Sequence, residues 1–449
     1  MTDPAVATIH AATRLRGELH LPGDKSVSHR ALILAGLASG ESRILGSGDG
    51  ADIRSTAEIV RALGARVERL AGDGSTVDYR VESPGIDRLT EPEGVLDCGN
   101  SGTSLRLMTG VLAGLPMTAT LDGDDSLRRR PVARIIEPLR SMGADLHGRQ
   151  DDSLPPVVVV GHFPLRAIEH TTTVPSAQVK SAILLAGLRA EGRTTVREAV
   201  ATRDHTERML RSRGVPVERT DDADGSVAWT VQGGMAVQAL TERVPGDVSA
   251  AAFWLVVGAI HPDAELTIRG VGLNPTRRAI VDLLRSMGAD IEERPDPAPQ
   301  GATDEGVGEP MADLIVRSST LRAIELTPTD VAAAIDEIPI LCLAATAAVG
   351  TTVIRGAGEL RHKESDRIDG TAAGLRALGA QIEIDGDDLS ITGGRRLRGA
   401  ATDGLDDHRL VMTFAVAGLV ASGETSVGRP QAASISYPRF FDDLERVRA

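Results

Sequence analysis

The sequence predicts an α/β or α+β fold built as two domains of three repeats each. A first observation is an echo at half the chain length, because PGDKS at 22–26 recurs as PGDVS at 245–249. A second is the helix-end signature LRxxGA, which recurs in close variants with glycines 71 to 91 residues apart. Alternating helix and strand patterns are the third observation. Self-similarity at this period indicates a repeat architecture, and the alternation indicates mixed α and β structure.

Each repeat is expected to contain a helix of small apolar residues, a turn with glycine and a short β-rich run. The inner helices are expected at 28–39, 104–114, 177–189, 249–260, 338–349 and 408–422. The strands that follow them are expected at 42–45, 118–121, 193–196, 265–268, 351–354 and 424–427. A second helix in the repeat ends at a glycine, which suits the left-handed turn that closes a helix. Its glycines are Gly64, Gly143, Gly214, Gly288 and Gly379, and residues 439–448 close the last repeat.

The half-chain echo sets the expected domain boundaries. One domain is expected at 22–244, and the other combines 1–21 with 245–449. The two echoed motifs would then lie where the chain passes between domains, and ligand pockets favour such interfaces. We therefore expect the active site in the inter-domain cleft. The Pro-, Gly- and acid-rich run at 293–310 is expected to form a surface loop.

Composition excludes several classes of protein. The net charge of −14 argues against a nucleic-acid-binding or anionic-membrane surface. Apolar runs do not reach the roughly 18 residues of a membrane span, and the N-terminal residues lack a basic-then-apolar leader pattern. We expect a cytoplasmic protein. The two cysteines offer neither a disulfide framework nor metal-ligand spacing, so no metal is expected.

Lysine is rare in this chain. Of 49 basic residues only Lys25, Lys180 and Lys363 are lysines, and the others are arginines. Their retention indicates places where a compact, mobile ammonium is needed instead of a planar guanidinium. Chance survival of surface lysines is the alternative for any single one. Lys180 lies one helical turn after Ser176, so it could face the same site.

Polar or capping residues open most of the inner helices, and helix N-termini attract phosphates and carboxylates. Plain N-capping explains any one of them equally well, but several aimed at one cleft would make a strong anion site. These helix-start residues are Ser26, Ser101 to Thr103, Ser176, Asp247 or Ser249, Asp336 and Asp407.

Short polar motifs add candidate chemistry. GSGDGA at 46–51 fits a dinucleotide fingerprint only superficially, because Asp49 and Asp52 would face the pyrophosphate. GNSGTSLR at 99–106, SLRRRP at 126–131, HKESDR at 362–367 and DDHR at 406–409 are each also explained by turns or exposed charged faces. Together they supply separated cations and a few carboxylates. That set suits group transfer between multiply anionic small molecules, with carboxylates and lysine moving protons.

Longer motifs give a specific resemblance. They are LPGDKSVSHRALILAGLASGES, GNSGTSLRLMTG, PSAQVKSAILLAGL, TRDHTERML, DEIPILCLAA, HKESDRI and DDHRLVMTFAVAGL. From about Leu21 to near the C-terminus, the chain resembles the 5-enolpyruvylshikimate-3-phosphate synthase family. The resemblance implies a two-domain inside-out α/β barrel of six βαβαββ repeats. It also implies a monomer that moves the enolpyruvyl group of phosphoenolpyruvate to the 5-hydroxyl of shikimate 3-phosphate through a tetrahedral intermediate. Inorganic phosphate is released, and no cofactor is needed.

The resemblance also assigns roles to residues. Asp336 would accept the 5-hydroxyl proton, and Glu364 would protonate the methylene carbon, with Lys25 sharing the proton traffic. The residues implied for shikimate 3-phosphate are Lys25, Ser26, Arg30, Ser176, Ala177, Gln178, Arg203, Asp336 and Lys363. Those implied for phosphoenolpyruvate are Lys25, Gly102, Arg130, Gln178, Arg367 and Arg409.

One position departs from the family pattern, and two rival functions stay open. Where many members carry a C-terminal lysine, this chain has Ser434 or Ile435. The closest rival is the sister enzyme that acts on UDP-N-acetylglucosamine, but its reactive cysteine is absent from the run at 122–131. A non-catalytic repeat protein that binds an anion is the second rival. It would explain the periodicity but not the clustered Lys, Asp and Glu residues.

Overall fold

The computed structural model describes residues 6–72, 74–295 and 308–448. The chain divides into two compact units, each described here by itself. Unit 1 comprises Met1–Pro22, Pro245–Pro297 and Met311–Ala449, and unit 2 comprises Gly23–Val244 and Ala298–Pro310. Most of the expected surface loop at 293–310 lies outside the described residues.

Two repeats of unit 2 show the βαβαββ pattern within one continuous segment each. In both, the first strand is parallel to the second, and the last two strands are antiparallel to their neighbours. One runs through β6 (Leu96–Asp97), α3 (Gly102–Ala113), β7 (Thr118–Asp122), α4 (Ala133–Ser141), β8 (Asp145–Gly148) and β9 (Leu154–Val160), with the short α5 (Arg149–Asp152) before β9. The other runs through β11 (Glu169–Thr172), α6 (Ala177–Gly187), β13 (Arg193–Glu198), α7 (His205–Ser212), β14 (Val217–Asp221) and β15 (Val227–Gln232). A small two-stranded sheet pairs β10 (Leu165–Arg166) with β12 (Ala190–Glu191).

The first repeat of unit 2 takes its first strand from a distant part of the chain. β16 (Thr241–Arg243) lies parallel to β3 (Ser39–Gly48) and completes the sheet order β16-β3-β5-β4. The other elements of this repeat are α1 (Lys25–Leu37), α2 (Ala51–Ala62), β4 (Arg66–Gly72) and β5 (Thr76–Pro84).

Unit 1 follows the same plan in two repeats, and its third repeat has a three-stranded sheet. Two strands near the N-terminus belong to the sheets of unit 1. β2 (Leu15–His20) lies parallel to β17, and β1 (Val6–His10) lies antiparallel to β25. The first repeat contains α8 (Val248–Ile260), β17 (Ala264–Gly272), α9 (Ala279–Ser286), β18 (Asp290–Pro295) and β19 (Met311–Arg317). The second contains β20 (Glu325–Leu326), α10 (Pro328–Ala333), α11 (Ile338–Ala347), β21 (Thr351–Ile354), α12 (Arg367–Ala377), β22 (Gln381–Asp385) and β23 (Asp388–Thr392). The third contains β24 (Ala401–Asp403), α13 (His408–Gly418), β25 (Glu424–Gly428) and α14 (Phe440–Val447), and its sheet has the order β1-β25-β24.

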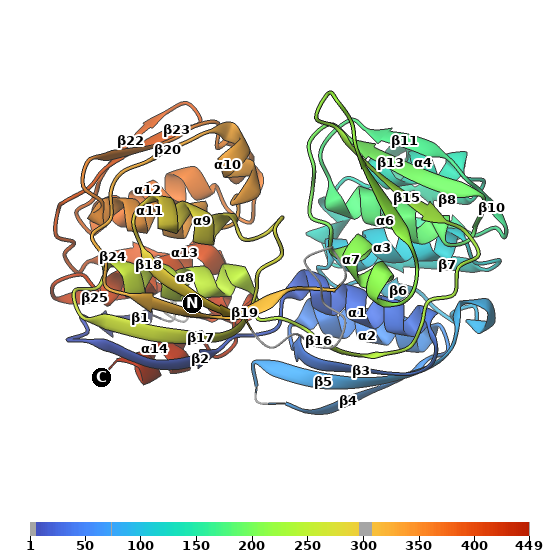
Figure 1. Cartoon of the computed structure of the whole chain (residues 1–449), viewed down its shortest axis with the longest axis horizontal. Helices are drawn as coiled ribbons and strands as arrows, with labels where there is room; N and C mark the ends of the chain where they lie inside the picture. Colours follow the sequence, from blue (N-terminus) through green and yellow to red (C-terminus); the bar gives the residue numbers. More distant parts are fainter. Residues whose placement is uncertain (1–5, 73, 296–307, 449) are drawn as a thin grey trace. The chain divides into compact units, whose positions relative to one another are not determined.

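Three helices form the centre of each unit. α1, α3 and α6 in unit 2 are buried on nearly every face, as are α8, α11 and α13 in unit 1. Helices that are apolar all round are typical of a protein interior. Figure 1 shows the sheets of each unit lying outside these helices. The predicted α/β fold of six repeats with the helices inside is confirmed, although the sheet of the sixth repeat has three strands where the βαβαββ plan has four.

The structure also confirms the predicted helix ends. The glycine after the second helix of the repeat has a φ of +77° to +107° at all five predicted positions, which disfavours any residue with a Cβ. Two helix starts differ by a residue or two. Asp24, and not Ser26, caps α1, because its carboxylate accepts a hydrogen bond from Val27 N at 2.9 Å. Glu337, and not Asp336, is the N-cap of α11.

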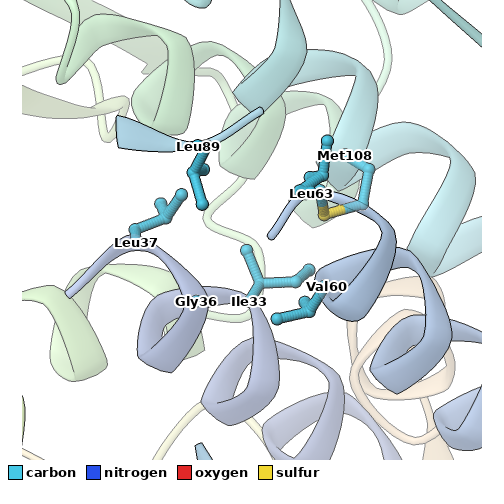
Figure 2. A pocket seen from close by; sticks show the side chains of 7 residues that line it. All are labelled: Ile33, Gly36, Leu37, Val60, Leu63, Leu89 and Met108. Atoms are coloured by element: carbon cyan, nitrogen blue, oxygen red, sulfur yellow. The ribbon is translucent and has the colours of Figure 1, made fainter. Parts of the chain in front are cut away.

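A small apolar pocket lies beside α1 and α2 within the core of unit 2 (Figure 2). Its cavity volume is about 10 Å³, close to the minimum for one water molecule. A buried water also needs polar partners, and the side chains that line this pocket are apolar. The lining residues are Ile33, Gly36, Leu37, Val60, Leu63, Leu89 and Met108. The pocket is a packing gap and offers no group for catalysis.

Candidate active site

The site residues suggested by the sequence fall into two groups, one in each unit. Most of them stand at or near the N-terminal ends of helices, where backbone N–H groups lack partners within the helix. Unit 2 holds Lys25, Ser26, Arg30, Gly102, Arg130, Ser176, Ala177, Gln178 and Arg203. Unit 1 holds Asp336, Lys363, Glu364, Arg367 and Arg409.

Arg30 is the most buried cation in the unit 2 group, with 3% of its surface exposed. Its guanidinium donates from Nε to Thr206 Oγ1 at 2.7 Å and from Nη2 to Ser181 Oγ at 3.0 Å. Nη1 donates to the backbone oxygen of Ser26 at 3.0 Å. Burial lowers the pKa of Arg30, partly offset by the charge of Glu207, yet a guanidinium stays protonated at neutral pH. The result is a rigid cation held one turn into α1.

Lys25 and Ser176 stand at the starts of α1 and α6. The Lys25 ammonium is exposed and forms an ion pair with Asp52 on α2. Ser176 is the N-cap of α6, and its hydroxyl accepts a hydrogen bond from Val179 N at 3.4 Å. Ala177 is the first residue of that helix, so its N–H is among the donors that a helix leaves unpaired. Both helix starts suit an anion.

Gly102, Gln178 and two arginines form a connected cluster. Gln178 accepts a hydrogen bond from Arg106 Nη1 at 2.6 Å and donates from Nε2 to Thr103 Oγ1 at 3.0 Å. Arg130 donates to Asn100 Oδ1 at 2.6 Å. A Cβ on Gly102 would lie 2.8 Å from Arg106 Nη1 and 3.4 Å from Arg130 Nη1. Glycine at this position therefore leaves the space in front of both guanidinium groups open.

Arg106 was not among the site residues suggested by the sequence. Burial and the charges of Arg130 and Arg134 lower the pKa of Arg106 to about 10. Its hydrogen-bond acceptors in the described chain are the neutral oxygens of Gln178 and Pro131. Partly buried cations that repel one another are stabilised by an anion between them. The position could have been found from its spacing, since it lies one helical turn after Gly102.

In unit 1 the two carboxylates with suggested proton-transfer roles share one guanidinium. Arg367 is 2% exposed, and its Nη2 donates to Glu364 Oε2 at 2.6 Å. Its Nη1 lies 3.5 Å from Asp336 Oδ1, and Lys363 Nζ lies 3.4 Å from the same oxygen. Burial lowers the pKa of Arg367, but the charges of Glu364, Asp407 and Asp336 outweigh it, so that the pKa is raised.

Asp407 binds Arg367 on the buried side of this group. It is fully buried, accepts a hydrogen bond from Arg367 Nε at 2.8 Å and caps α13 by accepting from Arg409 N at 2.8 Å. Burial raises the pKa of Asp407, but the hydrogen bond and charge of Arg367 lower it further, and the net shift is downward. The Nε atom of Arg409 is buried without a hydrogen-bond partner among the described residues. The unit 1 group thus combines two partly exposed carboxylates with three cations.

Lys180 was expected to face the same site as Ser176, but its side chain is buried in the core of unit 2. Its ammonium is completely buried between Glu198 and Glu207, at 2.7 and 2.8 Å. At Ser434 or Ile435, where the resemblance leads us to expect a lysine in the family pattern, both side chains are exposed. Within the described ranges, no three His, Cys, Asp or Glu side chains are placed to hold a metal ion. Among the described helices, none has the length and apolar character to cross a bilayer.

Comparisons with known proteins agree over nearly the whole chain. A family model described as EPSP synthase (3-phosphoshikimate 1-carboxyvinyltransferase) matches residues 9–444. The chain is 52% identical to the 3-phosphoshikimate 1-carboxyvinyltransferase of Gloeobacter violaceus, with 98% of each chain covered. It is 47% identical to that of Geobacter sulfurreducens, again with 98% of each covered. The solved EPSP synthase from Acinetobacter baumannii superimposes with a TM-score of 0.89 at 36% identity, covering 99% of this chain and 98% of that one. The chain therefore belongs to the EPSP synthase (3-phosphoshikimate 1-carboxyvinyltransferase) family.

Proposed function

We propose that the chain transfers the 1-carboxyvinyl group of phosphoenolpyruvate to the 5-hydroxyl of 3-phosphoshikimate, releasing phosphate, as a step of the shikimate pathway. The observation that carries the proposal is the pair of carboxylates, Asp336 and Glu364, that share the Arg367 guanidinium. Next to them in the fold of unit 1, the buried Nε of Arg409 has no hydrogen-bond partner among the described residues. In unit 2 the acceptors of Arg106 are neutral oxygens, and cations of both kinds suit anionic substrates. The UDP-N-acetylglucosamine reaction is not favoured, because the run at 122–131 lacks the cysteine that it needs.

The proposed chemistry assigns one role to each group. Asp336 takes the proton of the 5-hydroxyl as that oxygen attacks the second carbon of phosphoenolpyruvate, while Glu364 or Lys25 protonates the methylene carbon. The tetrahedral adduct then loses phosphate and a methyl proton to form the product enol ether. Arg106 and Arg130 would hold phosphoenolpyruvate with Arg367 and Arg409, because a guanidinium binds carboxylate or phosphate through two parallel hydrogen bonds.

The remaining contacts are proposed for 3-phosphoshikimate. Ser176, Ala177 and Lys363 would hold its phosphate, and Ser26, Arg30 and Arg203 the ring and carboxylate, with Gln178 between the ligands. We further propose that unit 1 corresponds to the domain 1–21 with 245–449, and unit 2 to the domain 22–244. The protein is proposed to act in the cytoplasm as a monomer, without a cofactor and without nucleic-acid or membrane partners. The net charge of −14 supports the exclusion of nucleic acid.

A single-turnover experiment tests the reaction. The protein is mixed with phosphoenolpyruvate and either 3-phosphoshikimate or UDP-N-acetylglucosamine, and free phosphate is measured with time. We expect phosphate release only with 3-phosphoshikimate. Release with the nucleotide sugar alone would support the sister enzyme, and no release with either acceptor would support a binding protein.

Replacing Gly102 by alanine is expected to raise the KM for phosphoenolpyruvate about 10-fold or more. The added Cβ would lie 2.8 Å from Arg106 Nη1, so the guanidinium or the ligand must shift, and shifts of this size in a site are costly. Steady-state kinetics at saturating 3-phosphoshikimate measure the effect. Gly94→Ala is the matched control, because a Cβ there meets no atom within 4 Å. An unchanged KM in the Gly102→Ala variant would contradict the assigned position of phosphoenolpyruvate.

A further inference from the structure

Unit 2 contains a buried cluster of three charges that the proposed mechanism does not use. Lys180 on α6 lies between Glu198 at the end of β13 and Glu207 on α7, and all three side chains are 0% exposed. Its Nζ is 2.7 Å from Glu198 Oε2, 2.8 Å from Glu207 Oε1 and 5.3 Å from the centre of the Trp229 ring. We call Lys180, Glu198 and Glu207 the lysine cluster.

Stability alone does not account for the lysine cluster. Removing charges from water costs several kcal/mol per ion, and well-packed apolar side chains of the same volume often stabilise a core as well or better. With both glutamates ionised, the cluster has two negative charges against one positive charge. Burial raises the pKa of Glu207, although Lys180 opposes the rise. A further cation nearby is needed to balance the negative charge of the cluster in its fully ionised form. Packing alone therefore does not explain why these three charged residues lie together.

The lysine cluster holds Thr202 in place through hydrogen bonds. The Thr202 hydroxyl donates to Glu198 Oε1, and the Thr202 N–H donates to Glu198 Oε2 at 3.4 Å. Lys180 Nζ donates to the Thr202 backbone oxygen at 3.4 Å. The hydroxyl and both backbone polar groups of Thr202 are therefore held by the lysine cluster. The next residue in the chain is Arg203, proposed above to contact 3-phosphoshikimate.

The residues next to the lysine cluster in the chain also hold Arg30. Arg30 donates to Thr206 and Ser181, the chain neighbours of Glu207 and Lys180, and these two hydroxyls lie 2.7 Å apart. The charge of Glu207 is the largest electrostatic contribution that favours the Arg30 cation. Arg30 is therefore held beside the cluster through the neighbours of Glu207 and Lys180, where its charge and that of Glu207 favour one another.

Arg30 and Arg203 are also close enough to repel one another, since the charge of Arg203 disfavours that of Arg30. Two neighbouring cations that share one buried anionic support present a fixed positive surface. A multiply anionic ligand is the partner that such a surface suits.

We propose that Lys180 is a positioning residue for 3-phosphoshikimate, which acts through Glu198 and Thr202 on Arg203 and through Glu207 on Arg30. The proposal rests on the proposed function for the identity of the ligand. Lys180 touches neither substrate, and it sets the position of the two arginines that do. It explains why a lysine stands at this position in a chain that otherwise uses arginine. One small ammonium can contact two carboxylates and a carbonyl oxygen in a closed core.

The test is a double variant that keeps the net charge of the cluster. In Lys180→Met/Glu198→Gln one cation and one anion are removed together, so Arg30 still balances Glu207. The dissociation constant for 3-phosphoshikimate, measured by titration calorimetry, is expected to rise about 10- to 100-fold, the range for losing a hydrogen bond to a charged group. The KM for phosphoenolpyruvate at saturating 3-phosphoshikimate should change less than about threefold, a split that general destabilisation does not produce.

Two further variants make the result decisive. Arg213→Met/Glu242→Gln is the matched control, because this buried ion pair lies at the C-terminal end of α7, away from Thr206. It should bind 3-phosphoshikimate as the unmodified protein does. Thr202→Val leaves every charge in place and removes one hydroxyl, so it tests the same path if the double variant does not fold. We expect it to weaken binding about threefold or more.

The outcomes separate this proposal from the proposed function. If the unmodified protein fails to bind 3-phosphoshikimate, the proposed function is wrong. If it binds, but the lysine-cluster variants bind equally well, Lys180 has only a structural role. Equal weakening in the Arg213 control would likewise overturn the proposal, because the effect would not depend on the path to Arg203 and Arg30.

Discussion

Asp336→Asn is expected to lower kcat by at least ~10²-fold, the scale of a general base contribution. The change keeps the shape of the side chain and its ability to accept hydrogen bonds from Lys363 and Arg367, which lie 3.4 and 3.5 Å away. It removes the negative charge of the partly exposed carboxylate and, with it, the capacity to take a proton. The stability of the fold should therefore hold while turnover falls. Single-turnover rates at saturating substrates measure the chemical step directly.

Asp388→Asn is the matched control for this experiment. Asp388 also pairs with an arginine of unit 1, with 3.2 Å between Oδ2 and Arg355 Nη1, but it lies on β23, where no role in the site is proposed. Its rate should equal that of the unmodified protein. A normal kcat in Asp336→Asn would show that another group accepts the 5-hydroxyl proton.

Arg367→Met is expected to lower the free energy of unfolding by about 3–5 kcal/mol at neutral pH. The side chain is 2% exposed and pairs with Asp407, whose side chain is 0% exposed. Methionine fills a similar volume but leaves a buried carboxylate without its cation. Urea denaturation measures the loss, and activity should vanish with it. Arg367→Met/Asp407→Asn should recover most of the stability but no activity, because asparagine can still cap α13.

The same pair predicts how the loss depends on pH. Because the pKa of Asp407 is lowered in the folded protein, its contribution to stability is present above the unfolded pKa of about 4 and is lost as the pH falls through the folded pKa. Without Arg367, burial is opposed only by the smaller effects of His408 and the Arg409 N–H, and the pKa of Asp407 rises. The difference in stability between the two proteins should therefore be largest near pH 7. It should shrink as the pH falls through the raised pKa of Asp407 in the variant and then through its lowered pKa in the unmodified protein. A difference that does not change with pH would mean that Asp407 is not the group left unpaired.

The sequence predicted the repeats well because they depend on local signals. Glycines such as Gly143 and Gly288 close helices through their backbone conformation alone, and small apolar runs identify the buried helices. Exact helix starts were less certain, since Asp24 and Ser26 are both good capping residues and only the fold decides between them. The difference between Glu337 and Asp336 has the same origin.

The sequence did not predict which charged residues are buried. Arg106 and Arg367 both stand near helix starts, and nothing local separates a guanidinium facing a ligand from one facing solvent. The rarity of lysine in this chain pointed to Lys180, but it did not indicate its partners. Glu198 and Glu207 come from a strand and from the helix that follows it. Which residues share an interior depends on how the repeats pack, and spacing along the chain does not encode that.

The borrowed strands bear on how the chain folds as it is synthesised. Unit 2 can close its first sheet once Thr241–Arg243 has left the ribosome. Unit 1 completes its sheets only after much more of the chain has been synthesised, because Val6 pairs with Gly428 and Leu15 pairs with Ala264. Its N-terminal strands therefore stay without their partners while the whole of unit 2 is made and folded. Contacts so distant in sequence form slowly and leave strand edges open to aggregation. Folding of unit 1 should thus be the slower event, even though the two units are built from the same kind of repeat.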